Sequence, residues 1–396
     1  MQVAGIIAEY NPFHVGHQYH IAETKRKLPG AAVICFMSGN FVQRGEPALL
    51  HKTARAKAAV LSGADVVFEL PVSAVLSPAE RFAKAGVWLA KACGVVTHLS
   101  FGSECGDIAL LQKAAFASNQ PEVHATRSAL LKQGLPYPKA AADALPADLQ
   151  PIIQSPNNLL GIEYIKAIAS LQAHFIPITV TRKGSAHDEP EETKAFPSAS
   201  AIRRIYREGR TPPEGALPPA MLASVEEERA QGRFPVNPAL LDTAVLAALR
   251  RADIKQLANL PEVSEGLENR LFKAARDCYT IEDLLASVKT KRYSLARLRR
   301  CLYACLLGLS KASQRAMPAY LRVLAVSETG RQVLANMRKI STLPVVTKPA
   351  MLKRLNGQAY EQAQLEAMAD HLFALAFPNP GAGSSVSFFT ASPYIV

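Results

Sequence analysis

The chain has 396 residues, of which 49% are hydrophobic and 20% charged, and its formal net charge is +12 at pH 7. This length exceeds what one hydrophobic core normally fills, so we expect two domains. No apolar run approaches the roughly 18 residues of a membrane-spanning helix, and the N-terminus lacks the layout of a signal peptide, which predicts a cytoplasmic protein without membrane contact. The excess of positive charge favours a polyanionic partner such as nucleic acid.

Five apolar runs rich in Val and Ile alternate with amphipathic stretches in the first half of the chain. The runs are Val3–Ala8, Ala31–Met37, Asp65–Leu70, Val95–Phe101 and Ile176–Thr181. Continuous apolar runs are typical of strands buried on both faces, and hence of a parallel sheet covered by helices. The helices expected between them are His17–Leu28, Leu49–Leu61, Pro78–Ala92, Ile108–Ser118 and Asn158–Leu171. This order predicts a doubly wound α/β fold, in which ligands bind beyond the carboxyl ends of the strands.

The second half shows a different pattern. One more helix is expected to begin near Ser198, and Gly209–Gly215 is interpreted as a linker because it is rich in Pro and Gly. Beyond residue 236 the expected helices are Ala239–Arg251, Gly266–Arg276, Ile281–Ala286, Ser294–Leu307, Met317–Ser327, Gly330–Ala335 and Gly357–Ala376. We therefore predict an α/β catalytic domain over residues 1–210 and a basic, all-α domain over residues 211–396.

The six cysteines are scattered along the chain and form no CxxC pair. Cys301 and Cys305 lie one helical turn apart, a spacing that could suit a metal ion, but no second ligand pair accompanies them. Six cysteines in a chain of this size are too sparse for a disulfide framework. We interpret them as small buried hydrophobic residues, and the sequence identifies no metal ligand.

A polar loop follows the first predicted strand and reads Glu9-Tyr10-Asn11-Pro12-Phe13-His14-Val15-Gly16-His17. We expect His14 at the end of the strand and His17 in the first turn of the next helix, where free backbone N–H groups face any bound anion. Gly16 would let a purine pack against the backbone. Two histidines three residues apart can hydrogen-bond to the charge that builds on an α-phosphate during attack. His14 and His17 are therefore the candidate catalytic residues.

This strand–NPFHxGH–helix unit resembles the HxGH nucleotidyltransferases, which are relatives of the class I aminoacyl-tRNA synthetases. More narrowly, the whole chain resembles the bacterial tRNA(Met) cytidine acetate ligase family. The segments that carry the resemblance are Glu9–His20, Met37–Ala48, Phe101–Asp107, Pro156–Tyr164, Pro261–Arg270, Val288–Tyr293 and Ala391–Val396. The resemblance implies activation of acetate by ATP to acetyl-adenylate and pyrophosphate. The acetyl group would then pass to N4 of the wobble cytidine of elongator tRNA(Met), giving N4-acetylcytidine.

The predicted ATP-binding residues come from several segments of the first half. The loop and its flanks contribute Ile7, Ala8, Glu9, Tyr10, Asn11, Pro12, Phe13, His14, Val15, Gly16, His17, Gln18, Tyr19 and His20. By resemblance Gly102, Asn157 and Arg182 also bind ATP. Local sequence alone leaves a turn glycine at Gly102 and a helix N-cap at Asn157 as alternatives. Arg182 suits a triphosphate, since it ends a predicted strand and a guanidinium binds phosphate bidentately.

A second phosphate site is expected at the helix that begins near Ser198. Many members of the superfamily carry an Ile-Ser-Ser-Thr-x-Ile-Arg motif there, and this chain keeps Ser198, Ser200, Ile202 and Arg203 but has alanine in other positions. We predict that Ser200 and Arg203 face the β- and γ-phosphates, with simple helix capping as the alternative. Mg²⁺ is expected because triphosphate chemistry of this kind normally uses it.

Other cations of the first half have open roles. Arg44 lies in a loop after the second predicted strand, where it either reaches the carboxylate or phosphates of the substrates or is solvated. Lys52, Arg55 and Lys57 begin the next predicted helix and are either phosphate ligands or surface charges.

The predicted tRNA-binding surface lies in the second half of the chain. Its residues are Lys289, Lys291, Arg292, Tyr293, Arg297 and Arg300. A cation cluster of this density, with Tyr293 available to stack on a base, fits RNA better than an ordinary solvated face. The identities of acetate and of the tRNA rest on the resemblance, and the sequence does not fix the oligomeric state.

Two other functions are compatible with the sequence. One is an adenylyltransferase that acts on a small phosphorylated metabolite, and the other is a non-catalytic RNA-binding protein with a nucleotide-sensing domain. The basic helical half argues against the first, because a metabolite transferase needs no such appendage. The intact pair His14 and His17 argues against the second.

Overall fold

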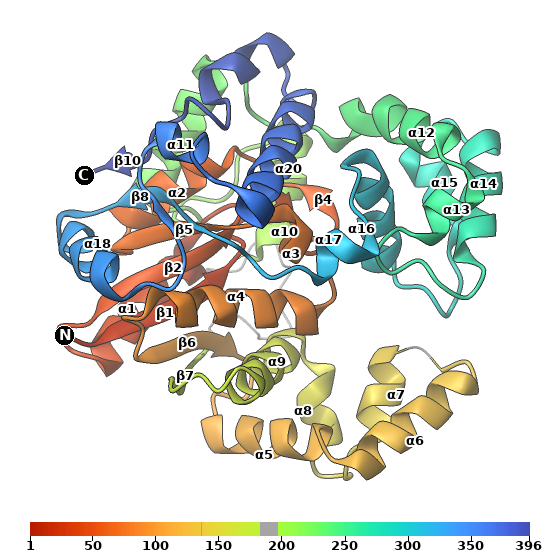
Figure 1. The fold of residues 1–396 in the computed structure, drawn as a ribbon, viewed down its shortest axis with the longest axis horizontal. Helices are drawn as coiled ribbons and strands as arrows, with labels where there is room; N and C mark the ends of the chain where they lie inside the picture. Colours follow the sequence, from red (N-terminus) through yellow and green to blue (C-terminus); the bar gives the residue numbers. More distant parts are fainter. Residues whose placement is uncertain (136, 183–196) are drawn as a thin grey trace.

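The structure, a computed structural model, describes residues 1–135, 137–182 and 197–396. Within these residues a central sheet has eight strands, with seven in the order β10-β8-β5-β2-β1-β6-β7 and β9 paired to β8 (Figure 1). The strands are β1 Val3–Ala8, β2 Ala32–Ser38, β5 Val66–Leu70, β6 His98–Ser103, β7 Ile176–Thr181, β8 Leu321–Val326, β9 Val345–Val346 and β10 Tyr394–Ile395.

The five strands predicted from the apolar runs all form, and they pair in parallel. β1 lies between β2 and β6, β2 also pairs with β5, and β6 also pairs with β7. β1 and β7 have the predicted bounds. Every residue of β2 and β5 is buried, as expected for strands covered on both faces. The prediction of a doubly wound α/β sheet is therefore confirmed.

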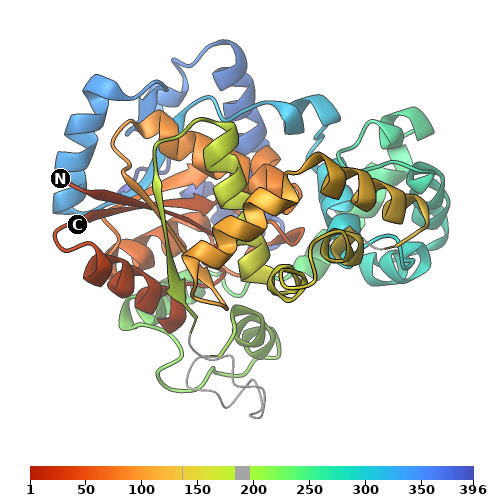
Figure 2. The same ribbon diagram turned by 90° about the horizontal axis from the view of Figure 1, so that it is seen from below.

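Helices cover both faces of this sheet (Figure 2). On one face, apolar side chains of the sheet pack against α1 Val15–Lys27, α2 Lys52–Leu61, α10 Ala199–Arg207 and α11 Pro219–Ala230. On the other face they pack against α4 Ala79–Cys93, α5 Ile108–Ser118, α9 Pro156–Ser170 and α18 Glu328–Ile340. Gly86 lets α4 approach β1, because a Cβ atom there would lie 2.6 Å from Ile7 Cδ1. The predicted helix near Ser198 is α10.

Two groups of helices extend beyond the sheet (Figure 1). The group that we call the helical lobe spans residues 242–315, and its apolar core continues into residues of α20 Gly357–Ala374 and of the segment 41–48. Its helices are α12 Asp242–Arg251, α13 Ile254–Ala258, α14 Leu267–Asp277, α15 Ile281–Val288, α16 Leu295–Leu306 and α17 Lys311–Arg315. The second group consists of α6 Pro121–Lys132, α7 Tyr137–Asp143 and α8 Gln150–Gln154. The sequence analysis did not predict these three helices.

The prediction of an all-α second half is wrong. Residues 321–326, expected to be helical, form strand β8, which pairs antiparallel with β5, and β10 pairs with β8. All six residues of β8 are buried, and a short apolar run of this kind has no periodicity that distinguishes a strand from a buried helix. The remaining elements of this part are α19 Pro349–Leu352, α20 Gly357–Ala374 and the 3-10 segment Pro380–Val386. The chain thus returns to the sheet, and the boundary near residue 210 stays a prediction.

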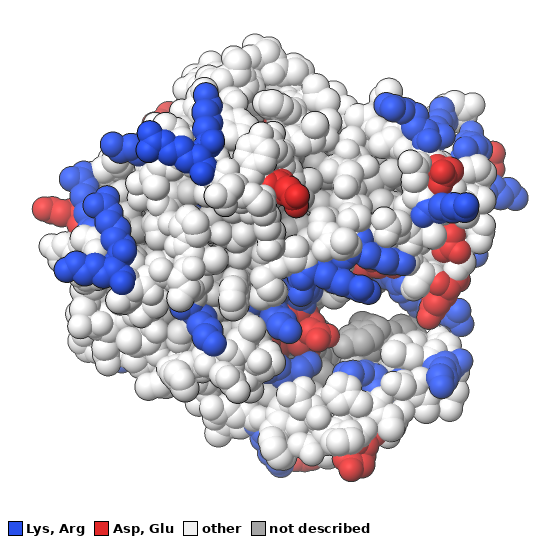
Figure 3. All heavy atoms as spheres, viewed as in Figure 1, with Lys and Arg blue, Asp and Glu red and all other residues white. Residues whose placement is uncertain are grey.

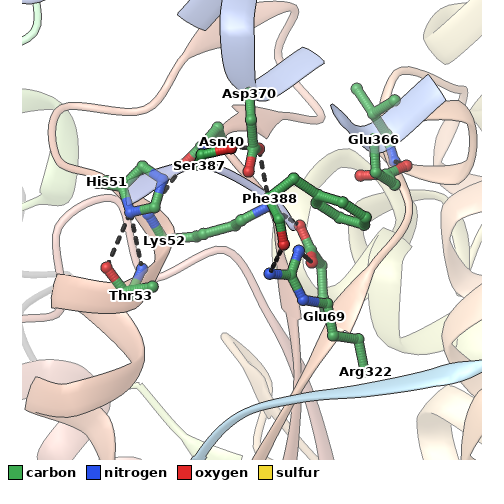
Figure 4. Close-up of polar contacts among 12 residues, drawn as sticks. Asn40, His51, Lys52, Thr53, Glu69, Arg322, Glu366, Asp370, Ser387 and Phe388 are labelled. Atoms are coloured by element: carbon green, nitrogen blue, oxygen red, sulfur yellow. Dashed lines mark hydrogen bonds and ion pairs between the residues drawn. The ribbon is translucent and has the colours of Figure 1, made fainter. Parts of the chain in front are cut away.

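A buried cluster of ion pairs connects α2, the sheet and α20 (Figure 4). The Lys52 ammonium lies 2.6 Å from a Glu69 carboxylate oxygen and 2.7 Å from Asp370, and Arg322 contacts the other oxygen of Glu69 at 3.2 Å. Arg55 is also buried and donates to the backbone carbonyls of Glu9, Ser38, Gly39 and Leu50. Both interpretations of Lys52 and Arg55, as phosphate ligands or as surface charges, are therefore wrong. Lys57 pairs with Glu227 at 2.7 Å.

Cys35, Cys93 and Cys301 are buried and free, which confirms their interpretation as small core residues. Cys105, Cys278 and Cys305 are free and partly exposed. In the described part of the chain, no helix has the length and apolar character needed to cross a membrane.

Candidate active site

A cavity of about 950 Å³ lies where β1, β6 and β7 end. Its floor includes Ala8, Gly102 and Arg182, which follow or end these strands. Its walls come from the beginnings of α1, α9 and α16. Parallel strands bring their carboxyl ends to one edge, so residues far apart in the sequence meet there. A volume of this size is within the range of sites that enclose a nucleotide-sized ligand.

The two candidate catalytic histidines stand together at the beginning of α1. His14 caps the helix, and its Nδ1 accepts a hydrogen bond of 3.0 Å from the backbone N–H of Gly16. His17 Nδ1 accepts a bond of 3.2 Å from the backbone N–H of His14. The imidazole centroids are 3.9 Å apart, and both rings line the cavity. The backbone of the helix N-terminus thus fixes both rings by their Nδ1 atoms.

Both histidines are held in the neutral form. Burial, and to a smaller extent Arg182, lower the pKa of His14 to about 3. Burial, His14 and Arg182 lower the pKa of His17 well below its ordinary value. Since each Nδ1 accepts a hydrogen bond, the proton of each neutral ring is on Nε2. Neither Nε2 has a hydrogen-bond partner among the described residues, so two N–H donors remain available to a ligand.

Gly16 makes room for the His14 ring. A Cβ atom at this position would lie 2.7 Å from His14 Cε1 and 3.0 Å from His14 Nδ1. Packing of a purine against this backbone stays a prediction. Gly16 still lines the cavity, and we infer that it is needed to hold His14 against the helix N-terminus.

A chain of hydrogen bonds links three residues on the wall opposite α1. Arg182 donates to Asn157 Oδ1 at 3.2 Å, and Asn157 Nδ2 donates to Glu104 Oε1 at 2.6 Å. The other Glu104 oxygen accepts the backbone N–H of Asn158 at 2.8 Å, so Glu104 satisfies the N-terminus of α9. Arg182, Asn157 and Glu104 all line the cavity. The structure thus brings the predicted Asn157 and Arg182 together. The alternative role of Asn157 as a helix cap is wrong, because α9 begins at Pro156 and its N-cap residue is Ser155.

Gly102 lies beside Arg182, as predicted. A Cβ atom at Gly102 would lie 3.4 Å from Arg182 Cγ, so a larger side chain would press on the arginine. On the floor of the cavity, His20 Nε2 lies 3.0 Å from Ser100 Oγ, and burial followed by Arg182 lowers the pKa of His20 to about 4. His20 is therefore a neutral, hydrogen-bonded part of the floor.

Most of the predicted loop lines the cavity, including Ile7, Ala8, Glu9, Tyr10 and Tyr19. Asn11, Pro12, Phe13, Val15 and Gln18 do not belong to its lining. Phe13 is fully buried in the core, where its ring lies 4.8 Å from that of Tyr10. Asn11 is buried and its Oδ1 accepts the backbone N–H of Leu49 at 2.7 Å. The buried side chains of Asn11 and Phe13 support the loop from the protein interior. A direct contact of these five side chains with ATP stays a prediction.

Ser200 and Arg203 lie outside this cavity and line a smaller one of about 460 Å³ beside it. Arg203 donates to the backbone carbonyl of Asn11 at 2.8 Å and pairs with Glu46 at 3.0 Å. Ser198 Oγ accepts the backbone N–H of Ala201 at 3.2 Å, so the capping alternative holds for Ser198. Contacts of Ser200 and Arg203 with the β- and γ-phosphates stay a prediction.

The residues of the predicted tRNA-binding cluster differ in their exposure to solvent. Lys289, Lys291 and Arg292 are exposed on the helical lobe and stay candidates. Tyr293 is 4% exposed and its hydroxyl donates to the carbonyl of Glu265, so it has no free ring face for a base, and the prediction of base stacking is wrong. Arg297 donates to the carbonyl of Glu262 at 2.7 Å.

Arg300 does not face solvent either. Its guanidinium is buried and bonded to both carboxylate oxygens of Glu262, at 2.5 and 2.7 Å. It also donates to the backbone carbonyl of Gln43 at 3.1 Å. The prediction that Arg300 binds tRNA is therefore wrong, because the guanidinium is buried and each of its three nitrogens donates to a protein atom.

Sequence reasoning did not predict several residues of the site. Among them, Glu104 and Arg299 line the main cavity. Glu9 was predicted as part of the loop, but its surroundings were not. Its Oε1 accepts the backbone N–H of Gln43 at 2.6 Å, and burial raises the pKa of Glu9 above its ordinary value. Tyr164, which lies on α9, also lines the cavity. The only sequence signal for Glu104 is its place after a strand, opposite the Asn-Asn pair that opens α9.

Comparison with known proteins places these features in a family context. A family model described as HIGH Nucleotidyl Transferase matches residues 1–385. A protein of Acetivibrio thermocellus named tRNA(Met) cytidine acetate ligase is 36% identical over 417 residues and covers 100% of both chains. A relative of the same name from Syntrophomonas wolfei is 36% identical over 413 residues, covering 99% of each chain. The crystal structure of Thermotoga maritima TmcAL bound with alpha-thio ATP has a TM-score of 0.92 at 31% identity and covers 100% of each chain.

Proposed function

Because the chain belongs to the HIGH nucleotidyl transferase family, we propose that it is a tRNA(Met) cytidine acetate ligase, the activity named in its full-length relatives. In the first step an acetate oxygen attacks the α-phosphorus of ATP, and pyrophosphate leaves. In the second step the N4 amine of the wobble cytidine in elongator tRNA(Met) attacks the acetyl carbon. A new C–N bond forms, AMP leaves and the amine loses a proton.

The observation that carries this proposal is the pair of neutral imidazoles at the helix N-terminus. Their Nδ1 atoms accept backbone N–H groups at 3.0 and 3.2 Å, so their Nε2–H groups are oriented toward the cavity before any ligand arrives. Donors preorganised in this way stabilise charge that develops on phosphate oxygens during attack. A neutral donor also leaves the negatively charged acetate nucleophilic, because it does not protonate the carboxylate.

The other groups of the cavity fit the binding of the triphosphate and the carboxylate. The exposed guanidinium of Arg182 attracts anions. Asn157 orients Arg182 through the bond to its Nη1. We assign Arg182 to the phosphates of ATP and the His14–His17 pair to the α-phosphate.

The described residues do not form a Mg²⁺ site by themselves. Among the described residues no group of three His, Cys, Asp or Glu side chains is arranged to hold a metal ion. The described part of the lining has two carboxylates: Glu104 is bonded to the N-terminus of α9, and Glu9 accepts the backbone N–H of Gln43 through Oε1. Mg²⁺ is commonly held by one or two carboxylates together with substrate phosphates. We therefore propose that Mg²⁺ enters with ATP, and that the enzyme works in the cytoplasm where its tRNA substrate is.

The test is incubation of the protein with ATP, labelled acetate and mixed tRNA, followed by nucleoside analysis. We expect label in N4-acetylcytidine of elongator tRNA(Met) and release of AMP and pyrophosphate. Transfer of AMP to a phosphorylated metabolite without labelled RNA would support the adenylyltransferase alternative. Failure to consume ATP in the presence of acetate and tRNA would support the non-catalytic alternative.

A further inference from the structure

The smaller cavity beside the ATP cavity is lined mostly by cations. Five arginines surround its volume of about 460 Å³: Arg44, Arg203, Arg204, Arg207 and Arg299. Glu46 lies 3.0 Å from Arg203 and 3.5 Å from Arg207, so one carboxylate serves two of the guanidinium groups. The cavity therefore keeps an excess of positive charge and suits a phosphate-bearing ligand.

Arg44 and Arg299 differ from the other three arginines in two respects. They line both cavities, which makes them the boundary between the two spaces. Within the part of the chain that the structure describes, neither side chain has a hydrogen bond or an ion pair. Arg44 is exposed and Arg299 is partly exposed, so both guanidinium groups can reach a ligand that enters from solvent.

The backbone holds these two arginines side by side. Arg44 lies at the turn of a hairpin formed by β3 Phe41–Val42 and β4 Glu46–Pro47. The next residue, Gly45, has a φ of 76° and a Cβ there would lie 2.5 Å from the backbone nitrogen of Arg300, so the turn presses directly on α16. Arg300 secures the contact by donating to the carbonyl of Gln43. Arg300 thus acts as a positioning residue for Arg44 and Arg299.

The geometry points to a role in RNA binding, an inference that rests on the proposed function. The reacting base must enter the ATP cavity, whereas the phosphates on either side of its nucleotide must stay at the cavity mouth. We propose that Arg44 and Arg299 bind the RNA backbone phosphates next to the nucleotide that is acetylated, with the smaller cavity receiving that strand. Lys and Arg side chains also gather along the hollow between the helical lobe and helices α7–α9 (Figure 3).

ATP is the other source of phosphate that the smaller cavity could hold. Against it, the main cavity has enough volume for a nucleotide and already contains a helix N-terminus, two neutral histidines and Arg182. Phosphate contacts of RNA position a strand without reading its sequence, and the guanidinium groups of Arg44 and Arg299 suit such contacts. The two sources make opposite predictions for the Michaelis constants.

The experiment compares Arg44→Gln, Arg299→Gln and the double variant with Arg338→Gln as a control. Arg338 is exposed on α18, so its variant loses the same charge away from both cavities. Acetylation is measured with a transcript of elongator tRNA(Met), and acetate-dependent pyrophosphate release reports ATP use. We expect the double variant to raise the KM for tRNA about tenfold, and to make the log–log salt dependence of RNA affinity shallower by roughly 1.4, at about 0.7 per single-strand phosphate contact. The melting temperature should stay near that of the wild type, and the KM for ATP should change much less than the KM for tRNA.

The remaining outcomes would overturn the inference. A raised KM for ATP with unchanged tRNA affinity would assign the smaller cavity to the phosphates of ATP, and no change in either constant would leave the arginines without a ligand role. Lysine variants at both positions should recover the salt dependence, since they restore charge. If the wild-type protein neither consumes ATP with acetate nor acetylates tRNA, the proposed function fails, and this result is separate from any effect of the arginines.

Discussion

The histidine loop and the buried ion cluster are two polar groups built on the same sheet, yet their hydrogen-bonding capacity is used differently. Around Lys52, the ammonium and the carboxylates of Glu69 and Asp370 are directed at one another and are nearly inaccessible to solvent. In the loop, His14 and His17 use only Nδ1 within the protein and keep Nε2–H for the cavity. The first group connects parts of the fold, and the second holds donors ready for a ligand.

This difference predicts different consequences of substitution. Removing one member of the ion cluster leaves buried charges without partners, so the cost appears in stability. Removing a histidine from the loop takes away a donor that faces the ligand, so the cost appears in the rate. The predictions below test this division, beginning with the largest effect.

Lys52→Met should lower the free energy of unfolding by about 3–5 kcal/mol, because buried Asp370 loses its cationic partner and buried Glu69 keeps Arg322 alone. Urea unfolding measures the effect. Lys113→Met provides the control, since Lys113 and Asp148 form a solvent-exposed pair that water screens. Equal stability of the Lys52 variant and the wild type would contradict the assignment of this cluster to the fold.

His17→Ala should lower kcat by a factor of about 10²–10³, or roughly 3 kcal/mol of barrier, because one preorganised donor to the α-phosphate is lost. The unfolding free energy should change little in comparison with Lys52→Met. His174→Ala is the matched control, since His174 is exposed and outside the cavity. Near-normal turnover of the His17 variant at saturating ATP and acetate would show that the reaction takes place elsewhere.

Arg182→Ala should raise the KM for ATP about tenfold, which corresponds to the lower end for a hydrogen bond to a charged group. Affinity for tRNA should remain close to the wild-type value, because Arg182 follows β7 and, unlike Arg44 and Arg299, does not line the smaller cavity. Arg182→Lys should recover ATP affinity only in part, as lysine lacks the planar fork. Loss of tRNA affinity to the same extent would mean that the two substrates share this residue.

The sequence was sufficient for the parts of this comparison that depend on local pattern. Continuous apolar runs located β1 and β7 to the residue, and because parallel strands end at one edge, His14, Gly102 and Arg182 were expected together there, as the structure has them. β8 was missed because LRVLAV has no periodicity of its own and becomes a strand by pairing with β5.

Charged residues were the least predictable from the sequence. Lys52 and Arg300 occupy helix positions that are usually solvated, and their burial depends on partners distant in the chain. Lys52 meets Asp370, which is 318 residues away, and Arg300 meets Glu262 and the carbonyl of Gln43. A local sequence pattern cannot predict partners that lie so far away in the chain. The same limitation hid Arg299, whose place at the ATP cavity depends on the contact between the hairpin and α16.

The smallest effect is a change in how stability depends on pH. In the folded protein burial lowers the pKa of His14 to about 3, whereas the unfolded chain has about 6.5, so the unfolded state binds more protons between these values. The contribution of His14 is complete above about pH 6.5 and decreases as the pH falls, by up to about 1.4 kcal/mol per pH unit. His14→Ala removes this proton site, so the slope of unfolding free energy against pH should become shallower by that amount between about pH 4 and 6.

A buried carboxyl group beside the ion cluster, that of Glu366 on α20, should respond with the opposite sign. Burial, and next the charge of Glu69, raise the pKa of Glu366 well above its ordinary value, so here the folded state binds more protons than the unfolded chain. Its contribution is complete below the ordinary pKa of a glutamate and is lost as the pH rises. Glu366→Gln keeps an acceptor for the backbone N–H of Val72, and it should remove a decline of stability toward high pH while leaving the acid side unchanged. Urea unfolding of both variants across one pH series measures the two slopes. If both variants shifted the pH dependence in the same direction, the histidines would not be held neutral for the ligand, and the contrast between an open and a closed polar group would not stand.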